Sequence, residues 1–455
     1  MSADPHPRRA LLADLGVALA AVLLVLAAVL VGTAVQRADG TLFVNWPPLL
    51  ASWGPHVGPG TPAAVVVAGV VVVYGPRVAA RLSWRALLGG AWAAAVVWTF
   101  SLALVDGWQR GVARRLTSRY EYLQVIDRFH DIPATLRDFT AHILLGSPEH
   151  WPAHVAGHPP AATLTFVLLD RIGLGGGAWA GVWCITVGGT ACVAVLVAVR
   201  ALAGEALARR AAPFLVLAPT AVWVGTSADG YFAAVAAWAL ALLALAVTGP
   251  APRTCAAAAG LLLGLACYLS YGLTLIAVIA AAVLLLGRDG LRTRALSLLL
   301  PGLLGLAVVP VAFTLAGFDW WEAYRLLVVR YGQGAGGFRP YGYWVWANLA
   351  CTVLMAGLAT VAGLRRAGAT LRAPRAGAGA GDPGDRRLAF LVLAALLALL
   401  VADLSGMSKA ETERIWLPFA VWLLPAGAFL TGPRAWLAAQ AGLALLVNHL
   451  LLTGW

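Results

Sequence analysis

The sequence predicts an all-α polytopic membrane protein. Hydrophobic residues make up 61% of its 455 residues and charged residues only 11%, whereas about a quarter of an ordinary soluble domain is charged. Apolar runs of roughly 20 residues, which can cross about 30 Å of hydrocarbon, recur along the whole chain. We expect about thirteen transmembrane helices, near residues 12–35, 63–80, 86–106, 177–199, 211–226, 230–247, 254–270, 272–287, 295–315, 342–362, 388–403, 416–431 and 435–452.

Arginines predict the orientation of these spans. The formal net charge is +12, and basic residues gather in the loops that would share one side of the membrane with the N-terminus. Such loops are usually cytoplasmic. We therefore expect a multi-pass protein of a bacterial-type plasma membrane with a cytoplasmic N-terminus. The positive charge is explained by this asymmetry and gives no indication of nucleic-acid binding.

The chain divides at a segment of low complexity. Residues 365–387 are rich in Ala, Gly, Pro and Arg, a composition typical of flexible linkers. The predicted organisation is an N-terminal membrane bundle over residues 1–364, this basic cytoplasmic linker, and a C-terminal segment of three helices over residues 388–455. The five cysteines lie in apolar runs without CxxC spacing, which favours neither a disulfide framework nor a thiolate metal site.

The long polar interval at residues 107–160 contains most of the candidate chemistry. Its apolar spacing predicts surface helices near residues 119–129 and 133–145. Glu121 and Asp127 are six positions apart, so on one helix they would point to different faces. Either acid could instead pair with a neighbouring arginine on a solvated face. The apolar stretch 161–169 that follows is too short to cross the membrane, and we expect it to dip in or to lie along the outer surface.

Histidines in this interval raise the question of a divalent metal ion. His150, His154 and His158 are spaced i, i+4, i+8, and His130 and His142 precede them. Pro152 interrupts a continuous helix through the last three, and no cysteine joins them. A metal site and a substrate contact by His158 both remain open at this point.

The order of these motifs resembles that of the GT-C glycosyltransferases. Glu121-Tyr122-Leu123 is followed 37 positions later by His158-Pro159-Pro160, then by Ala208-Arg209-Arg210 and by an Asp229 in the turn at residues 225–230. The layout looks most similar to the branch of protein O-mannosyltransferases, the lipid A aminoarabinose transferase, and the actinobacterial cell-envelope mannosyl- and arabinosyltransferases.

The resemblance implies transfer of a sugar from a polyprenyl-phosphate carrier to an extracytoplasmic glycan, lipid or protein acceptor. Such a transfer needs a carboxylate near the acceptor hydroxyl and cations near the departing phosphate. Glu121 is the first candidate for the base, Asp127 is the reserve, and Asp229 is a third catalytic candidate. Asp229 could also act as the N-cap of the span that follows it.

Substrate-binding candidates come from three further places. Lys409, Glu411 and Arg414 lie in the polar segment 403–414 just before an apolar run, where an unpaired arginine is costly unless it binds an anion. Arg414 could instead pair with Glu411, three positions earlier. Arg339 and Tyr341 belong to a glycine-rich strip that could cover a sugar and a phosphate, and Tyr120 completes the set.

A different class of function is also compatible with basic groups beside a hydrophobic groove. A non-catalytic transporter or flippase of a lipid-linked sugar would need ionisable groups near the middle of the membrane. Apart from Asp14, charged residues are almost absent from the predicted spans, and no internal repeat is evident. The sequence therefore favours the enzyme.

Overall fold

The computed structural model describes residues 7–225, 227–374 and 382–454, and it is an all-α polytopic membrane protein. In this part of the chain, eight helices are long and apolar enough to cross a membrane. They are α1 (Pro7–Asp39), α2 (Thr61–Arg81), α3 (Trp84–Ala103) with its extension η1 (Leu104–Asp106), α7 (Gly177–Gly188) continued by α8 (Thr190–Ala203), α11 (Asp229–Thr248), α12 (Pro252–Leu269), α15 (Ala295–Leu315) and α20 (Pro383–Leu404).

A ninth candidate span is bent in its middle. The two helices α18 (Tyr341–Ala356) and α19 (Leu358–Arg372) meet at 107°. Gly357 between them has φ +86°, and a Cβ at this position would lie 3.1 Å from the side chain of Gln440. Both the left-handed backbone and the lack of space favour glycine, so the bend is built into the sequence.

About thirteen spans are expected from the sequence, and the structure differs where prolines divide the apolar runs. The run at 211–226 becomes α9 (Glu205–Val216), which ends ahead of Pro219, and α10 (Ala221–Val224). Proline lacks an N–H and disfavours helix in the residue before it. The other shorter or more polar elements at predicted spans are η6 (Tyr271–Leu275), α13 (Ile276–Leu286), α22 (Leu417–Ala420), η7 (Leu424–Phe429) and α23 (Pro433–Leu450).

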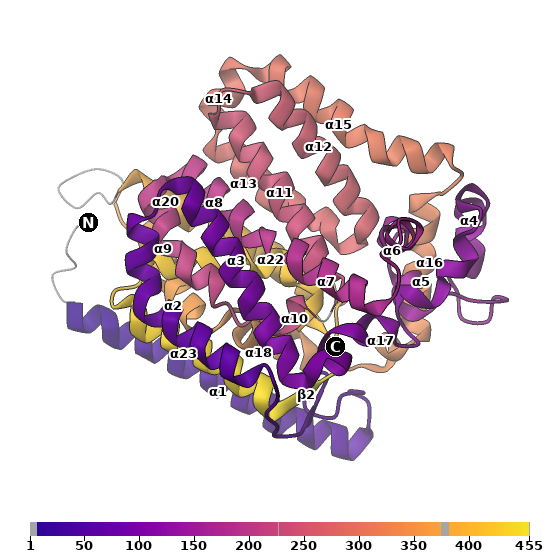
Figure 1. The fold of residues 1–455 in the computed structure, drawn as a ribbon, viewed down its shortest axis with the longest axis horizontal. Helices are drawn as coiled ribbons and strands as arrows, with labels where there is room; N and C mark the ends of the chain where they lie inside the picture. Colours follow the sequence, from indigo (N-terminus) through magenta and orange to yellow (C-terminus); the bar gives the residue numbers. More distant parts are fainter. Residues whose placement is uncertain (1–6, 226, 375–381, 455) are drawn as a thin grey trace.

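Small residues allow the helices to pack closely. In Figure 1, α12 and α15 lie side by side at the top, and α1 lies along the bottom edge. A Cβ on Gly260 would meet the carbonyl oxygen of Gly302 at 2.0 Å, and one on Gly305 would meet that of Ala257 at 2.1 Å. The backbones of α12 and α15 therefore touch directly, as is common between membrane helices.

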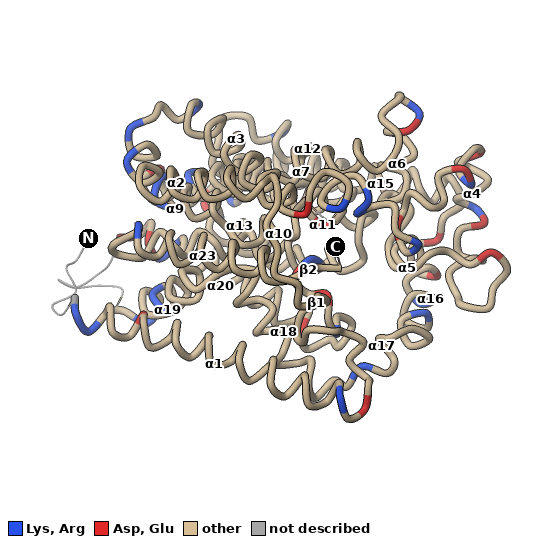
Figure 2. The backbone as a smooth tube through the Cα atoms, turned by 60° about the horizontal axis from the view of Figure 1, so that its bottom comes forward, with Lys and Arg blue, Asp and Glu red and all other residues tan. Residues whose placement is uncertain are grey.

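One end of the bundle is rich in arginine. Figure 2 shows basic residues gathered at the end where the N-terminus lies. Asp14 of α1 is fully buried there, and its carboxylate accepts 2.8 Å hydrogen bonds from Nε of both Arg365 and Arg366 on α19. The acid that the sequence places inside the first span is thus compensated by two cations, as a buried charge requires.

Most described residues of the predicted linker at 365–387 are helical. Residues 365–372 belong to α19, and α20 begins at Pro383. Arg365 and Arg366 at the start of the linker contact Asp14. The Ala-Gly repeat at 376–381 lies outside the described residues.

The opposite end of the bundle carries most of the irregular structure, and we call it the site end. Short strands β1 (Ala51–Trp53) and β2 (Leu451–Thr453) pair antiparallel, with Ala51 opposite Thr453. The loop at 107–160 is mostly short helical turns rather than the two longer helices expected. Its elements are η2 (Gln109–Ala113), η3 (Arg115–Thr117), η4 (Tyr122–Phe129), α4 (Ile132–Asp138), η5 (Phe139–His142) and α5 (Ala153–Gly157). The remaining elements of the chain are α6 (Ala161–Arg171), α14 (Arg288–Thr293), α16 (Trp320–Gln333), α17 (Ala335–Phe338) and α21 (Thr412–Ile415).

Candidate active site

Four segments that are distant in sequence meet at the site end. Glu121 lies just before η4, His154 is in α5, Asp229 is in the first turn of α11, and Arg414 is in α21. All four side chains are buried. An acid in the first turn of a helix interacts favourably with the positive end of the helix dipole.

The backbone before α21 has an unusual shape. Ala410 and Glu411 both have positive φ angles, +70° and +62°. Non-glycine residues adopt this left-handed conformation at a cost of about 1–3 kcal/mol each. The two consecutive turns redirect the chain, so that α21 begins abruptly and presents Glu411 and Arg414 to the other segments.

Arg414 connects three of the four segments. Its Nη1 donates a 2.7 Å hydrogen bond to Asp229 Oδ2. Its Nη2 donates to Glu411 Oε2 at 2.9 Å and lies 3.0 Å from His154 Nε2. Although burial of Glu411 acts to raise its carboxyl pKa, the charges of Arg414 and Arg339 outweigh this effect and leave the pKa below its ordinary value.

His154 continues the network to Glu121. Its Nδ1 lies 2.9 Å from Glu121 Oε1. The other carboxylate oxygen, Oε2, is buried and has no hydrogen-bond partner among the described residues. Glu121 is 2% exposed, so it is not the solvated surface acid that pairs with Arg119, Arg128 or Arg137. Asp229, Arg414, His154 and Glu121 form one chain of contacts, which we call the buried network.

A second set of contacts extends from Glu411 toward the glycine-rich strip. Arg339 Nη1 lies 3.5 Å from Glu411 Oε1 and donates a 2.7 Å hydrogen bond to the carbonyl of Lys409. Lys409 Nζ donates to the carbonyl of Gly336 at 3.0 Å, and its backbone N–H donates to the hydroxyl of Tyr331. Segments α16, α17 and 403–414 are therefore held together at the edge of the buried network.

Glu413 is the most enclosed acid of this region. It is fully buried, its Oε1 accepts a 3.3 Å hydrogen bond from the backbone N–H of Leu50, and its Oε2 has no partner in the described structure. Burial raises the pKa of Glu413 to about 7. The residue was not singled out from the sequence, since its position beside Arg414 gave no sign that it would face away from it.

Aromatic rings form a wall beside the network. Tyr122 stacks on Phe166 with centroids 5.5 Å apart and meets His158 edge-on at 5.7 Å. Burial lowers the pKa of His158 to about 4, and its Nδ1 donates to the carbonyl of His154 at 2.8 Å. His158 is therefore neutral at neutral pH, and its Nε2 can accept a hydrogen bond from a ligand but supplies no positive charge.

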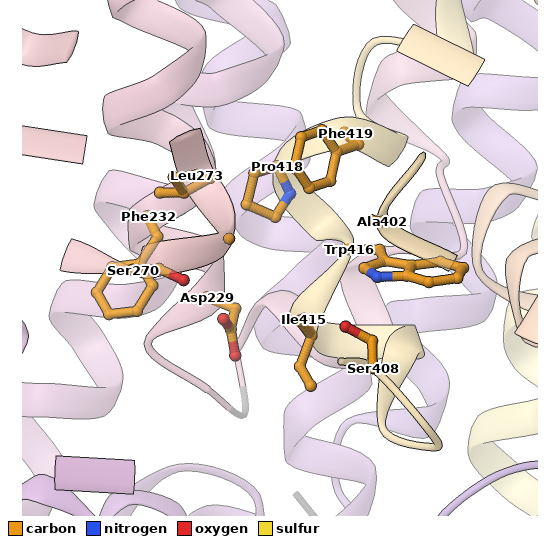
Figure 3. A pocket seen from close by; sticks show the side chains of 11 residues that line it. Asp229, Phe232, Ser270, Leu273, Ala402, Ser408, Ile415, Trp416, Pro418 and Phe419 are labelled. Carbon is orange, nitrogen blue, oxygen red and sulfur yellow. The ribbon is translucent and has the colours of Figure 1, made fainter. Parts of the chain in front are cut away.

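A small cavity lies next to Asp229 (Figure 3). Its volume is about 30 Å³, room for a water molecule or two. Ser270, Ser408 and Trp416 line it together with Asp229. The indole Nε1 of Trp416 is buried without a hydrogen-bond partner among the described residues, so the cavity has a donor available for a polar guest.

A larger apolar groove lies on the other side of Tyr231. Its volume is about 560 Å³, and its lining comes mainly from α6, α7, α11, α12 and α15. The Tyr231 hydroxyl lies 3.1 Å from Thr165 Oγ1 in the groove wall. Arg171 also lines it and donates to the carbonyls of Phe129 and His130. Tyr231 follows Asp229 by two residues, so the groove and the buried network share the first turns of α11.

The structure brings most of the candidate residues predicted from the sequence together, but not all of them. Glu121, Asp229, Glu411 and Arg414 are in or next to the buried network, Arg339 and Lys409 lie at its edge, and His158 lies in the aromatic wall. Asp127 is exposed and makes no ion pair within the described residues. Tyr120 and Tyr341 are exposed as well; Tyr341 donates to the carbonyl of Leu404 at 3.2 Å.

These contacts bear on the alternatives for Arg414 and Asp229. Arg414 does pair with Glu411, and it also pairs with Asp229. Asp229 makes no side-chain cap, since α11 begins at Asp229 itself. In the described part of the chain, no group of three or more His, Cys, Asp or Glu residues is arranged to hold a metal ion.

Comparisons with known proteins give limited information. No protein-family model and no curated protein matches the chain. The chain is similar to the structure of ArnT from Cupriavidus metallidurans bound to undecaprenyl phosphate, with 16% identity and a TM-score of 0.46 over 73% of this chain and 58% of that one. It is also similar to the apo oligosaccharyltransferase of Archaeoglobus fulgidus, with 14% identity and a TM-score of 0.48 over 76% and 51% of the two chains. The matches span about half to three fifths of those proteins, and at TM-scores below 0.5 they establish neither a family nor an activity for this chain.

Proposed function

We propose that this chain is an integral-membrane glycosyltransferase of the GT-C type. It would move a sugar from a polyprenyl-phosphate carrier to a glycan, lipid or protein acceptor on the extracytoplasmic side of the plasma membrane. The observation that carries this proposal is the buried network, in which two carboxylates, a histidine and an arginine from four segments converge. Acids and cations arranged in a water-poor site are what an acid-base transfer on a phosphate-linked sugar needs.

Glu121 is the proton acceptor in this proposal. The acceptor oxygen attacks the anomeric carbon of the sugar, and its proton passes to Glu121 Oε2. The bond between the anomeric carbon and the phosphate oxygen breaks, and its electron pair leaves with the polyprenyl phosphate. The geometry supports Glu121 because Oε1 is held by His154, whereas Oε2 has no partner in the described structure.

Lys409 and Arg414 are the proposed ligands of the phosphate. An ammonium group has three donors, and the structure uses one donor of Lys409, toward Gly336. Arg414 is already surrounded by two carboxylates, so a bound phosphate would have to displace at least one of them. Arg339, Tyr341 and the strip around α17 would cover the sugar from above.

The apolar groove beside Tyr231 is the proposed path of the carrier chain. Its lining is almost wholly hydrophobic, and its volume of about 560 Å³ is in the range of small-molecule sites in proteins. The groove includes Tyr231 in the first turns of α11, and a lipid lying in it with its phosphate toward the start of this helix would present the phosphate to the buried network.

The transporter or flippase is the alternative. A charged headgroup that crosses a membrane needs polar partners along its whole path. Among the described residues, the buried charged side chains other than Asp14 are all near the buried network: Glu121, Asp229, Arg339, Asp403, Glu413 and Arg414. This distribution favours the enzyme.

Purified protein incubated with a panel of radiolabelled polyprenyl-phosphate sugars tests the proposal. We expect one donor to lose its label to an added peptide, lipid or glycan acceptor, with release of polyprenyl phosphate. The same donors in sealed liposomes report flipping. Protein-dependent flipping without transfer of the label would refute the enzyme and support the transporter.

A further inference from the structure

His154 is the residue that connects Glu121 to Arg414. Its Nδ1 is 2.9 Å from Glu121 Oε1 on one side, and its Nε2 is 3.0 Å from Arg414 Nη2 on the other. The side chain is only 11% exposed. It was considered from the sequence only as a metal ligand, because the spacing of histidines along the chain does not indicate which acids lie beside them.

The protonation of His154 follows from its neighbours. A guanidinium has only donors, so Nε2 must accept the hydrogen bond from Arg414 and carries no proton. Arg414 Nη2 has two hydrogens, and Glu411 Oε2 takes the other at 2.9 Å. The imidazole proton is therefore on Nδ1, the nitrogen that lies 2.9 Å from Glu121 Oε1.

This tautomer orients Glu121. Nδ1 lies 2.9 Å from Oε1, and Oε2 is buried without a hydrogen-bond partner among the described residues. A carboxylate with a donor beside one oxygen and no partner on the other can take a proton at the second oxygen. The opposite tautomer would place a lone pair against the carboxylate and a proton against the arginine, and both contacts would be repulsive.

We infer that His154 is a positioning residue, which transmits the state of Arg414 to Glu121. The inference rests on the proposed function. When Arg414 is in place, it selects the Nδ1–H tautomer, and that tautomer aims Glu121 at the acceptor. When Arg414 moves away from Nε2, it no longer selects this tautomer. The imidazole can then adopt the Nε2–H tautomer, which has no proton to donate to Glu121. Binding of the phosphate at Arg414 and the orientation of the Glu121 carboxylate are thereby linked through His154.

The two contacts of His154 can be separated by amide substitutions. In His154→Asn the amide branches at the same carbon as Nδ1, so it can still donate to Glu121 but does not reach Arg414. In His154→Gln the amide lies one bond further out and can accept from Arg414, but it no longer anchors Glu121. If His154 only filled space, His154→Asn and His154→Gln would have similar effects on activity.

We expect His154→Gln to affect mainly kcat and His154→Asn to affect mainly the donor KM. His154→Gln should lower kcat by about 10²-fold with little change in the donor KM, because the base loses its orientation. His154→Asn should keep kcat within about tenfold and raise the donor KM. His142, which pairs with Asp138 at 2.8 Å in the same loop but outside the buried network, gives matched controls: His142→Asn and His142→Gln should change neither constant. Equal losses of kcat and equal donor KM values in the two His154 variants would overturn the role.

A spectroscopic measurement of the His154 tautomer tests this contact without an activity assay. In wild-type protein labelled with ¹⁵N-histidine, the resonances of His154 should report a neutral ring with the proton on Nδ1, and they should be absent from His154→Asn. If that variant fails to fold, replacing the other histidines in turn gives the same assignment. A proton on Nε2, or on both nitrogens, would refute the inference. If the tautomer is Nδ1–H but wild-type protein transfers no sugar from any donor, the hydrogen-bonded link stands, while the proposed function and the role in it both fail.

Discussion

Asp229 and Arg414 are 185 residues apart in the chain, yet their side chains form a 2.7 Å ion pair in which both are about 95% buried. This pair connects the start of α11 to α21 and fixes the centre of the buried network. Removing one partner of a buried ion pair leaves the other charge uncompensated, which typically costs about 3–5 kcal/mol. Variants at these positions therefore have to be tested for folding before they are tested for function.

Arg414→Lys should weaken binding of the donor. The lysine keeps the positive charge but cannot reach Asp229, Glu411 and His154 together or bind a phosphate with two parallel donors. If Arg414 holds the phosphate, the loss should exceed the 0–1 kcal/mol of an exposed ion pair by about 1 kcal/mol or more. Equilibrium binding of the radiolabelled donor measures it. Arg325→Lys, an exposed change on α16, is the control, and unchanged affinity in folded Arg414→Lys would assign Arg414 to structure alone.

Glu121→Gln should abolish most of the transfer while the donor still binds. The amide oxygen can still accept from His154, but the side chain can no longer take a proton. We expect turnover to fall by about 10²–10⁴-fold, the usual contribution of a general base. Asp138→Asn, at an exposed acid of the same loop, should be nearly normal. Near-normal turnover in Glu121→Gln would exclude the role, and a large loss in Asp127→Asn or Asp229→Asn instead would move the base there.

Glu413 should make folding less favourable as the pH rises. Burial raises its pKa to about 7 in the folded protein, from an ordinary value of 4.5. Between pH 4.5 and 7 the unfolded chain gives up this proton while the folded protein keeps it, so stability falls as pH rises through this window, by up to about 3 kcal/mol. Glu413→Gln should remove this slope and be more stable than wild type at pH 8.

Thermal or denaturant unfolding in detergent at pH 5 and pH 8 measures the effect of Glu413. Glu411 supplies a control of opposite sign, because its pKa is lowered in the folded protein. Glu411→Gln should therefore lose stability at neutral pH, and the loss should shrink as the pH falls through the folded pKa of Glu411. An unchanged slope in Glu413→Gln would show that another group titrates.

The orientation of the chain can be measured with single cysteines. We expect residues 107–160 and 403–414 to face the extracytoplasmic side, on the basis of the arginine asymmetry. Ser118 and Ser405 are exposed, so cysteines placed there should react with an impermeant thiol reagent in intact cells. A cysteine at Thr254, beside the arginine of a predicted cytoplasmic loop, should react only after lysis. The reverse pattern would contradict both the orientation and the proposed carrier chemistry. Cys255 and Cys267 are partly exposed and should be replaced beforehand.

Local patterns were sufficient for the membrane class and for the segments that carry the polar residues. Apolar runs identify helices because every backbone group in a membrane must be paired within the helix. The same patterns did not resolve how prolines divide a run, since the expected helix at 211–226 is α9 and α10 on either side of Pro219. They also gave no sign that Arg365 and Arg366 in the predicted linker contact Asp14, some 350 residues away in sequence.

The pairing of the charged side chains was decided only by the tertiary structure. From the sequence, Glu121 has three arginines within reach along the chain, whereas in the fold it is buried against His154. The pairing of Arg414 with Glu411, which is near in sequence, was one of two alternatives for Arg414, but nothing local pointed to Asp229. A charge in a low-dielectric interior is held by whichever partners the packed helices bring to it. The sequence by itself determined which residues enter the membrane and which stay polar, while the packing of α5, α11 and α21 determined which of those polar groups act together.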